Sequence, residues 1–237
     1  MNKIVHRSID RGFSNLGWLE SYHSFSFADY VDLDKMHFGA LRVLNDDRVD
    51  AGKGFSMHSH QNMEIISIPL SGGLEHQDNM GNRSIIQQGD VQVMSAGKGI
   101  FHSEYNKNQN REVQFLQIWV IPNKKDVVPR YDQISIIDLQ IKNQLYQILS
   151  PIPEDDGTWI HQEAWFYLGE FDRDKKQTYE IKKTGNGVYV FVLEGEIKIS
   201  GEKINQRDAI GIWNTSSIEI SAETDSRLLV IDVPMID

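Results

Sequence analysis

Short runs of apolar or alternating residues recur along the whole chain, and none has the length or period of a helix. Typical runs are MEIISIPL at 63–70, VQFLQIWVI at 113–121 and RLLVIDV at 227–233, and clusters such as NMGN at 79–82 separate them. Many short strands with turn residues between them indicate an antiparallel sandwich or barrel. Because no segment sustains a 3.6-residue period, we expect an all-β protein whose helices are few and short.

The chain also resembles itself. Leu70-Ser71-Gly72 opens a stretch that reaches Gly89-Asp90, and Leu193-Glu194-Gly195 opens a similar stretch that reaches Arg207-Asp208. Two copies of one β unit imply a tandem duplication. The pattern breaks in the polar segment 122–133, which contains two prolines. We therefore predict an amino-terminal domain of residues 1–130 and a carboxy-terminal domain of residues 131–237.

Charge and composition exclude several classes of function. The formal net charge of the 237 residues is −10, and basic residues cluster only in pairs such as Lys124-Lys125. Direct nucleic-acid binding is therefore disfavoured, since it normally requires a basic surface. No apolar run approaches the roughly 20 residues of a membrane span, and the first residues lack the apolar core of a signal peptide. The absence of cysteine removes disulfides and thiolate ligands. We expect a cytoplasmic protein with no membrane partner.

Two pairs of candidate metal ligands stand out among the eight histidines. His58-Ser59-His60 precedes a predicted strand, and His102-Ser103-Glu104 repeats the same spacing later in the chain. Strand side chains alternate faces, so both members of each pair point the same way. Two such pairs on neighbouring strands can direct four ligands to one ion, and three imidazoles with a carboxylate suit Fe, Ni, Cu, Zn or Mn. Glu64 shares the parity of His58 and His60, and parity alone does not decide between Glu64 and Glu104.

The residues around these pairs resemble the cupin signature. Gly52, His58, His60 and Glu64 follow its first half, and Gly72 closes that half one residue late. In the second half the proline is missing and His102 comes two positions late. These departures are those of the pirin family, whose second motif is similar to GDVQVMSAGKGIFHSEY at 89–105. HSFSFADY at 23–30 and FGALRVLNDD at 38–47 also resemble pirin segments, most closely those of bacterial pirin-like quercetin dioxygenases.

The resemblance implies a bicupin, with two tandem antiparallel β-barrel or jelly-roll domains. It also implies that His58, His60, His102 and Glu104 bind one divalent transition metal ion. Iron is the first expectation, with nickel, copper, manganese, zinc and cobalt as alternatives. Glu64 then becomes a barrel-interior residue or a hydrogen-bond partner of a ligand. The second copy has Ile181 and Lys183 at the positions of His58 and His60, so we expect its barrel to be metal-free.

By the same resemblance, the leading hypothesis is a quercetin 2,3-dioxygenase-type enzyme, an oxidoreductase that opens a flavonol or similar phenolic ring with dioxygen. Glu104 would be the catalytic base that accepts the proton of the substrate hydroxyl. Phe55, Met57 and Phe101 would provide an apolar surround for a small aromatic substrate. The alternative is a non-catalytic, redox-sensing metal protein that binds a regulatory partner, and a metal-dependent isomerase is a third reading because fold does not set chemistry. The oligomeric state is not predicted.

Other residues near the motifs have simpler interpretations. His76 and Asp78 could border the site, but a turn at 78–81 is the preferred role for Asp78. The aromatic cluster of Tyr22, Phe25, Phe27 and Tyr30 is expected to pack in the core.

Overall fold

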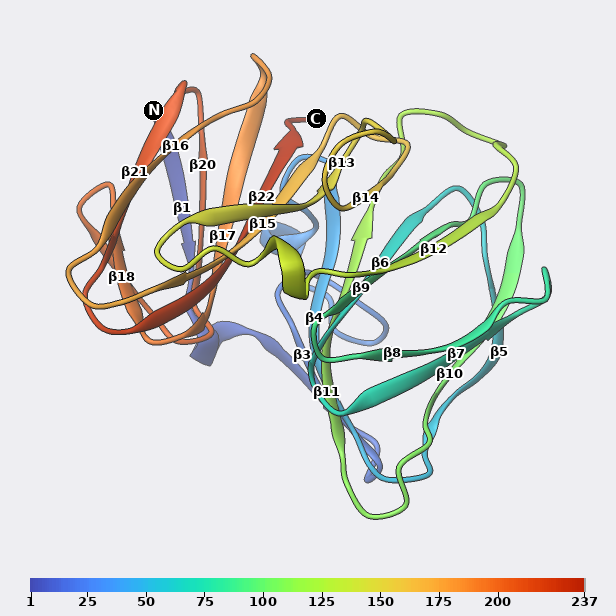
Figure 1. The fold of residues 1–237 in the computed structure, drawn as a ribbon. Helices are drawn as coiled ribbons and strands as arrows, with labels where there is room; N and C mark the ends of the chain where they lie inside the picture. Colours follow the sequence, from blue (N-terminus) through green and yellow to red (C-terminus); the bar gives the residue numbers. More distant parts are fainter. Residues whose placement is uncertain (237) are drawn as a thin grey trace.

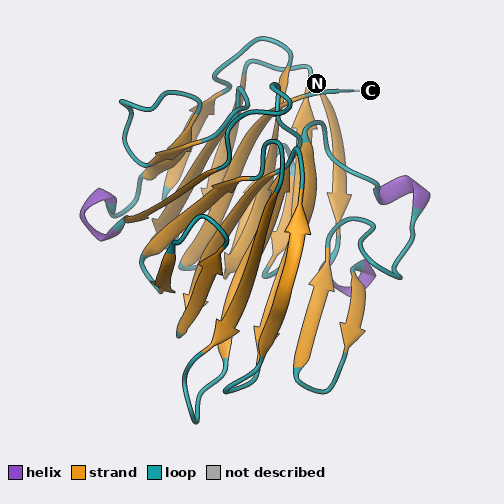
Figure 2. Ribbon diagram, turned by 90° about the vertical axis from the view of Figure 1, so that its right-hand side faces the viewer, coloured by secondary structure: helices purple, strands orange, loops and turns teal. Residues whose placement is uncertain are grey.

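The computed structural model describes residues 1–236 and consists of two β barrels side by side (Figure 1). In each barrel a seven-stranded sheet faces a four-stranded sheet, which confirms the predicted bicupin architecture. The helices of the described residues are three 3₁₀ turns, η1 (Ser8–Asp10), η2 (Leu33–Lys35) and η3 (Ile137–Leu139), which lie at the edges of the stacked strands in Figure 2. None of these helices is long and apolar enough to span a membrane.

The strands divide between the two barrels as follows. The amino-terminal barrel contains β2 (Gly12–Asn15), β3 (Leu19–His23), β4 (Leu41–Val49), β5 (Gly54–His60), β6 (Glu64–Ser71), β7 (Gly73–Asp78), β8 (Arg83–Gln87), β9 (Asp90–Ser95), β10 (Ile100–Asn106), β11 (Val113–Val120) and β12 (Arg130–Ser135). The carboxy-terminal barrel contains β1 (Asn2–His6), β13 (Leu145–Ser150), β14 (Thr158–Trp159), β15 (Trp165–Phe171), β16 (Lys176–Glu180), β17 (Asn186–Glu194), β18 (Glu196–Ile199), β19 (Glu202–Asn205), β20 (Ala209–Trp213), β21 (Ser217–Ala222) and β22 (Ser226–Pro234).

The strand orders of the two barrels correspond, apart from the outer strand β2, which is antiparallel to β3, and β14, which is parallel to β13. The large sheets run β12-β9-β6-β11-β4-β3-β2 and β1-β20-β17-β22-β15-β13-β14, and the small sheets run β5-β10-β7-β8 and β16-β21-β18-β19. Gly72 and Gly195 occupy the corresponding turns β6–β7 and β17–β18, with φ of 73° and 80°. The left-handed region costs a glycine little, which explains why this residue marks both copies of the repeat. The structure therefore agrees with the duplication inferred from the sequence.

The two barrels exchange their outermost strands, so they do not divide at the predicted boundary between residues 130 and 131. β1, at the start of the chain, pairs with β20 of the second barrel, and β12, which extends to Ser135, pairs with β9 of the first. Figure 1 shows the blue β1 among the orange and red strands. Each half thus supplies an edge strand to the other's large sheet. No single boundary in the sequence therefore separates the strands of one barrel from those of the other.

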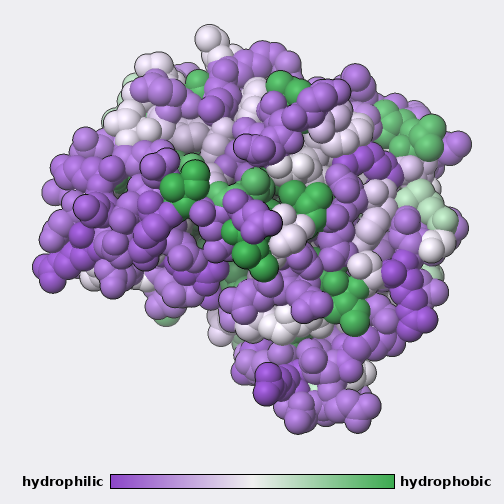
Figure 3. All heavy atoms as spheres, viewed as in Figure 1, coloured by the Kyte–Doolittle hydropathy of each residue, from purple (hydrophilic) through white to green (hydrophobic). Residues whose placement is uncertain are grey.

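The large sheets pack against each other and bury one continuous core between the barrels. β17 illustrates the arrangement, since Tyr189 and Phe191 point into this shared core while Val188, Val190 and Val192 point into the second barrel. Both faces of β17 are buried, so its sequence is a continuous apolar run rather than an alternating one. Figure 3 shows a mostly hydrophilic face on which several apolar residues gather near the middle, where the barrels meet.

The two barrel interiors differ in what fills them. The second contains one large apolar cluster, mainly of Ile and Val from β17, β18, β20 and β21. The first contains two small apolar clusters, one around Phe115 and one around Met94. Polar side chains such as Asn45, Asp47 and Gln117 lie buried on its large sheet and border an internal cavity. The amino-terminal barrel therefore has the interior that can accept a ligand.

Candidate metal centre

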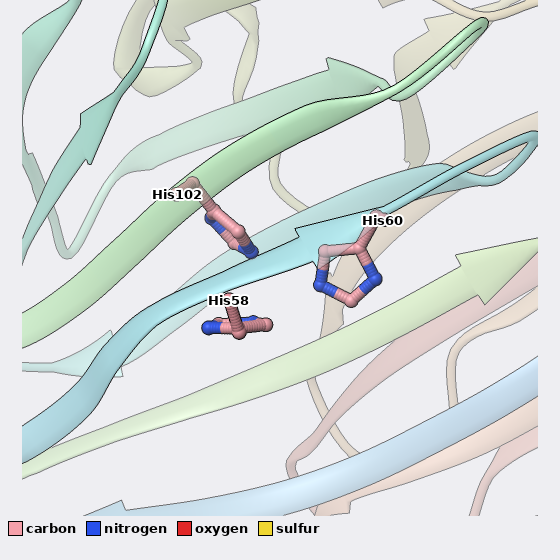
Figure 4. A group of neighbouring side chains, drawn as sticks. All are labelled: His58, His60 and His102. Atoms are coloured by element: carbon pink, nitrogen blue, oxygen red, sulfur yellow. The ribbon is translucent and has the colours of Figure 1, made fainter.

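Three of the predicted ligands meet at the inner face of the small sheet. His58 and His60 come from β5 and His102 from β10, and the ring centroids lie 4.4 Å (His58–His102), 4.8 Å (His58–His60) and 5.0 Å (His60–His102) apart. One nitrogen of each ring lies within 4.8 Å of the others. Figure 4 shows the three rings gathered around a common space. The register of β5 and β10, in which His102 pairs with His58, produces this convergence.

A bulge next to this pair adjusts which side chains face inward. His102 pairs with His58, but Glu104 pairs with Phe55, so β5 uses three residues where β10 uses two. The bulge lets Phe55, His58 and His60 all border the same cavity, since an extra residue shifts the alternation of faces. Gly54 makes the close approach possible, because a Cβ there would lie 2.1 Å from the backbone oxygen of Glu104.

In His58 and in His102, the hydrogen bonds leave one ring nitrogen available to bind a metal. His58 Nδ1 donates to the Ser56 carbonyl at 2.8 Å, which leaves its Nε2 as the lone-pair nitrogen. His102 Nε2 is buried and has no hydrogen-bond partner among the described residues. Burial lowers the pKa of His102 to about 3 and that of His60 to about 4, and the neighbouring histidines act in the same direction. Neutral imidazoles are the form that binds metals.

A chain of hydrogen bonds orients His102 from behind. Its Nδ1 lies 3.4 Å from Nδ1 of His76, whose Nε2 lies 3.2 Å from Oδ2 of Asp78. With His76 Nε2 donating to the carboxylate, His76 Nδ1 accepts from His102 and leaves His102 Nε2 without a proton. Such carboxylate–histidine partners set the tautomer and angle of a metal ligand. Asp78 also accepts from the backbone amides of Met80 and Asn82, so the expected turn role holds as well.

Glu104 is buried beside the histidines, but its carboxylate is held by the opposite sheet. Ser67 donates to Oε1 at 3.2 Å and Gln117 donates to Oε2 at 2.9 Å. Its carboxylate forms a close group with His76 and His102, whereas the close group of His58, His60 and His102 does not include it. The structure thus brings three of the four predicted ligands together and places the fourth at the wall of the same cavity.

Glu64 does not lie inside the barrel, and that expectation was wrong. It pairs with Ser95 and Val120, on the side of β6 that faces the shared core between the barrels. Ser95 donates to its carboxylate at 2.7 Å, and burial raises the pKa of Glu64 to about 7. The loop at 61–63 between β5 and β6 breaks the strand alternation, so parity counted from His60 fails at Glu64.

A cavity of about 270 Å³ opens from His58 and His60 toward the large sheet. Its apolar lining comes from Leu16, Leu19, Phe27, Phe55 and Trp119. Phe27, from the predicted aromatic cluster, therefore borders the site, whereas Phe25 is buried in the shared core. Met57 and Phe101 do not line the cavity and are each 51% exposed. The volume is close to the lower end of the roughly 300–1,000 Å³ typical of small-molecule pockets.

The wall opposite the histidines is polar, and the sequence patterns missed it. Ser21 donates to Asp47, and His23 bonds through Nδ1 to Asn45 at 2.9 Å and through Nε2 to Ser14 at 3.0 Å. Burial raises the pKa of Asp47 to about 7, so its carboxyl can donate or accept a proton near neutral pH. The alternating polar positions 21, 23, 45 and 47 on two neighbouring strands were the signal available in the sequence.

The donor set fits a divalent transition metal. The buried, unpartnered Nε2 of His102 would otherwise incur the cost of desolvation without a hydrogen bond. Two further histidines and one carboxylate border the same space. Nitrogen-rich sites of this kind bind iron, nickel, copper or zinc rather than calcium or magnesium.

Comparison with known proteins identifies the family. Residues 5–120 match the family described as Pirin, and residues 147–233 match the one described as Quercetinase C-terminal cupin domain. The chain is 40% identical over 230 residues to an Escherichia coli K12 protein named quercetin 2,3-dioxygenase, covering 97% of this chain and 98% of that one. It is 35% identical to a pirin-like protein of Caulobacter vibrioides, over 93% of this chain and 95% of the relative.

Comparison with solved structures leads to the same family. The crystal structure of the bacterial pirin YhhW from Escherichia coli in complex with nickel(II) superimposes with a TM-score of 0.93 at 37% identity, over 99% of this chain and 100% of that one. The chain belongs to the pirin family.

Proposed function

We propose that this pirin-family chain binds one divalent transition metal ion through His58, His60, His102 and Glu104 and uses it to open a flavonol or similar phenolic ring with dioxygen. The observation that carries the proposal is the convergence of three imidazoles, one with an unpartnered nitrogen, beside a cavity that His58 and His60 line. Two findings support it: a relative of 40% identity is named quercetin 2,3-dioxygenase, and a structural neighbour was solved with nickel(II).

The metal, when bound, would act as a Lewis acid that lowers the pKa of a phenolic hydroxyl and exchanges electron density with dioxygen. The protein's part is to hold the substrate and move its proton. Glu104 borders the cavity and would accept the hydroxyl proton. Gln117 and Ser67 keep its two oxygens in place, so the carboxylate does not need to reorganise for the reaction.

The cavity wall supports a substrate with several hydroxyl groups. Phe27, Phe55 and Trp119 offer aromatic surface to a flat ring. Asp47 and Asn45 lie across the cavity and can exchange hydrogen bonds with ring hydroxyls, while His23 bonds to Asn45 and orients it. The indole Nε1 of Trp119 is buried and, in the described part of the chain, has no partner, so it can donate to a substrate oxygen. A hydrophobic slot with polar groups at its far wall matches a polyphenol better than an aliphatic acid or a sugar.

The test measures the metal content of the protein, its oxygen uptake and its release of carbon monoxide. Protein expressed without added metal is assayed by elemental analysis, then loaded in turn with iron, nickel and copper and supplied with quercetin. We expect oxygen uptake with release of carbon monoxide by at least one loaded form. His58→Ala should lose both metal and turnover, because it removes one of three nitrogen ligands. Glu104→Gln should keep most of the metal and lose turnover, because the amide cannot accept the proton.

A matched control is His161→Ala, which removes a histidine that packs against Trp159, outside the cavity. It should retain both properties. Full turnover by metal-free His58→Ala would refute the proposal. Tight metal binding without oxygen uptake on any phenol would instead favour a redox-sensing regulatory protein.

A further inference from the structure

A second cavity, of about 450 Å³, lies where the two barrels meet and shares no lining residue with the metal-site cavity. Tyr22, Asp46 and Gln114 reach it from β3, β4 and β11 of the first barrel. Gln206 and Arg207 reach it from the turn between β19 and β20 of the second. Ser8, Ile9 and Arg11, near the start of the chain, complete the lining. We call this cavity the arginine cleft.

Two guanidinium groups share one carboxylate in the arginine cleft. Arg207 Nη1 lies 3.2 Å and Arg11 Nη1 lies 3.7 Å from the same oxygen, Oδ2 of Asp46. The side chains of Arg11 and Asp46 are only 4% and 6% exposed, and that of Arg207 is 22% exposed. The other carboxylate oxygen accepts from Gln114 at 3.1 Å. The charged lining residues therefore leave one positive charge in excess, within a chain whose formal net charge is −10.

One buried donor of the two arginines has no partner. Across residues 1–236, Nε of Arg11 makes no hydrogen bond, whereas Nη1 of Arg207 is held by its ion pair with Asp46. Burial lowers the pKa of Arg11, and the charge of Arg207 acts in the same direction. Buried guanidinium groups are normally paired and hydrogen-bonded, so the open Nε of Arg11 and two guanidinium groups sharing one carboxylate indicate a missing anion. A carboxylate fits this geometry because its two oxygens can accept from two guanidinium groups.

The backbone at Arg207 provides an independent observation. Arg207 has a φ of +66°, and the corresponding residue of the first copy is Gly89, with a φ of +93°. A glycine adopts this region without steric cost, whereas an arginine there is strained. Strained residues of this kind gather at binding sites, where the side chain is needed. The repeat therefore has an arginine at a backbone position that favours glycine, and this arginine points its charge at Asp46.

We propose that the arginine cleft binds the carboxylate of a small organic acid with an apolar body. The carboxylate would accept from Arg11 and Arg207 and supply the missing negative charge. Ile9 and Tyr22 line the same cleft and are 88% and 42% exposed, so they offer apolar surface to the rest of the ligand. The site is separate from the metal centre and does not depend on the proposed dioxygenase activity.

The experiment is a calorimetric titration of the full chain with benzoate, with benzamide as the neutral analogue and inorganic phosphate as the alternative oxyanion. Arg207→Gly removes the guanidinium and installs the residue that the backbone favours, so the variant should fold at least as well as the wild type. We expect benzoate to bind the wild type and to bind Arg207→Gly about 10- to 100-fold more weakly, as for the loss of a charge-assisted hydrogen bond. Benzamide should not bind.

Asp174→Gly is the matched control, since Asp174 also has a positive φ, of 65°, and lies outside the arginine cleft. It should bind benzoate like the wild type. Equal benzoate affinity of the wild type and Arg207→Gly would overturn the proposal, as would no binding at all. Loss of benzoate binding in His60→Ala, with retention in Arg207→Gly, would assign the ligand to the metal centre instead. Binding of phosphate but not benzoate would refute the organic carboxylate.

Discussion

Nδ1 of His102 lies 3.4 Å from Nδ1 of His76, and this contact turns the unpartnered nitrogen of His102 toward the other two histidines. His76 is fully buried between that contact and Asp78, with its ring stacked on Tyr131. The orientation of one proposed ligand is thus set by residues of β7, a strand that contributes no ligand to the group of three histidines.

Replacement of His76 by phenylalanine should weaken metal binding and leave the fold intact. Phenylalanine keeps the stacked ring but cannot hold the tautomer of His102, so nickel affinity should fall about 10- to 100-fold. Calorimetric titration of the metal-free protein with nickel measures the change. His161→Phe, outside the cavity, is the control and should bind nickel like the wild type. Unchanged nickel affinity in His76→Phe would show that the contact does not orient the ligand.

Gly54→Ala should displace Glu104. The added Cβ would lie 2.1 Å from the backbone oxygen of Glu104, so β5 and β10 must separate at the bulge. We expect turnover to fall at least tenfold, since misplacing a catalytic group by about 1 Å has that effect. Gly73→Ala is the control, because its Cβ would lie 3.0 Å from Cγ2 of Ile85 and 3.6 Å from the nearest backbone atom, the carbonyl oxygen of Ile86. Equal turnover in the two variants would contradict the role of Gly54.

Trp119→Phe should separate metal binding from turnover. The phenylalanine ring can still pack against His60, which the indole contacts at a centroid distance of 4.9 Å, but it lacks the free N–H donor. Metal content should persist while kcat/KM on a flavonol falls about tenfold, the effect of one lost hydrogen bond. Trp159→Phe, in the second barrel, should change neither quantity. A parallel loss of metal and turnover would mean that Trp119 acts only through packing.

Glu64 should make the folded protein less stable as the pH rises. Burial raises its pKa from 4.5 to about 7, so the folded state binds this proton more tightly than the unfolded state does. The resulting stabilisation is complete below the unfolded pKa, near 4.5, and is lost as the pH rises through about 7. Its size is of the order of 3 kcal/mol.

Urea unfolding of the metal-free chain at about pH 5 and about pH 8 tests this. Glu64→Gln should lose much of the difference between the two pH values, whereas Glu219→Gln, at an exposed position, should retain it. A pH dependence in Glu64→Gln as steep as that of the wild type would contradict the prediction.

Local patterns in the sequence were sufficient for the architecture and for the candidate histidines. Alternation and turn residues predicted an all-β fold, and the two similar stretches predicted the duplication that both sheet orders display. The spacing of His58 and His60 placed both rings on one face because strand parity is a local property. The resemblance to pirins directed attention to Glu104 rather than Glu64.

Packing between residues far apart in the sequence determined the features that local patterns did not predict. Glu64 faces the shared core because a loop resets the alternation after His60, and no count along the sequence detects that change. Strand β1 joins the second barrel, and Asp47 meets the metal-site cavity across the barrel interior, through contacts between residues far apart in the chain. Arg11 and Arg207 become neighbours only when the barrels pack together. Parity and turn chemistry act over a few residues, whereas register, edge exchange and domain packing depend on the burial of whole sheets, which only the tertiary structure specifies.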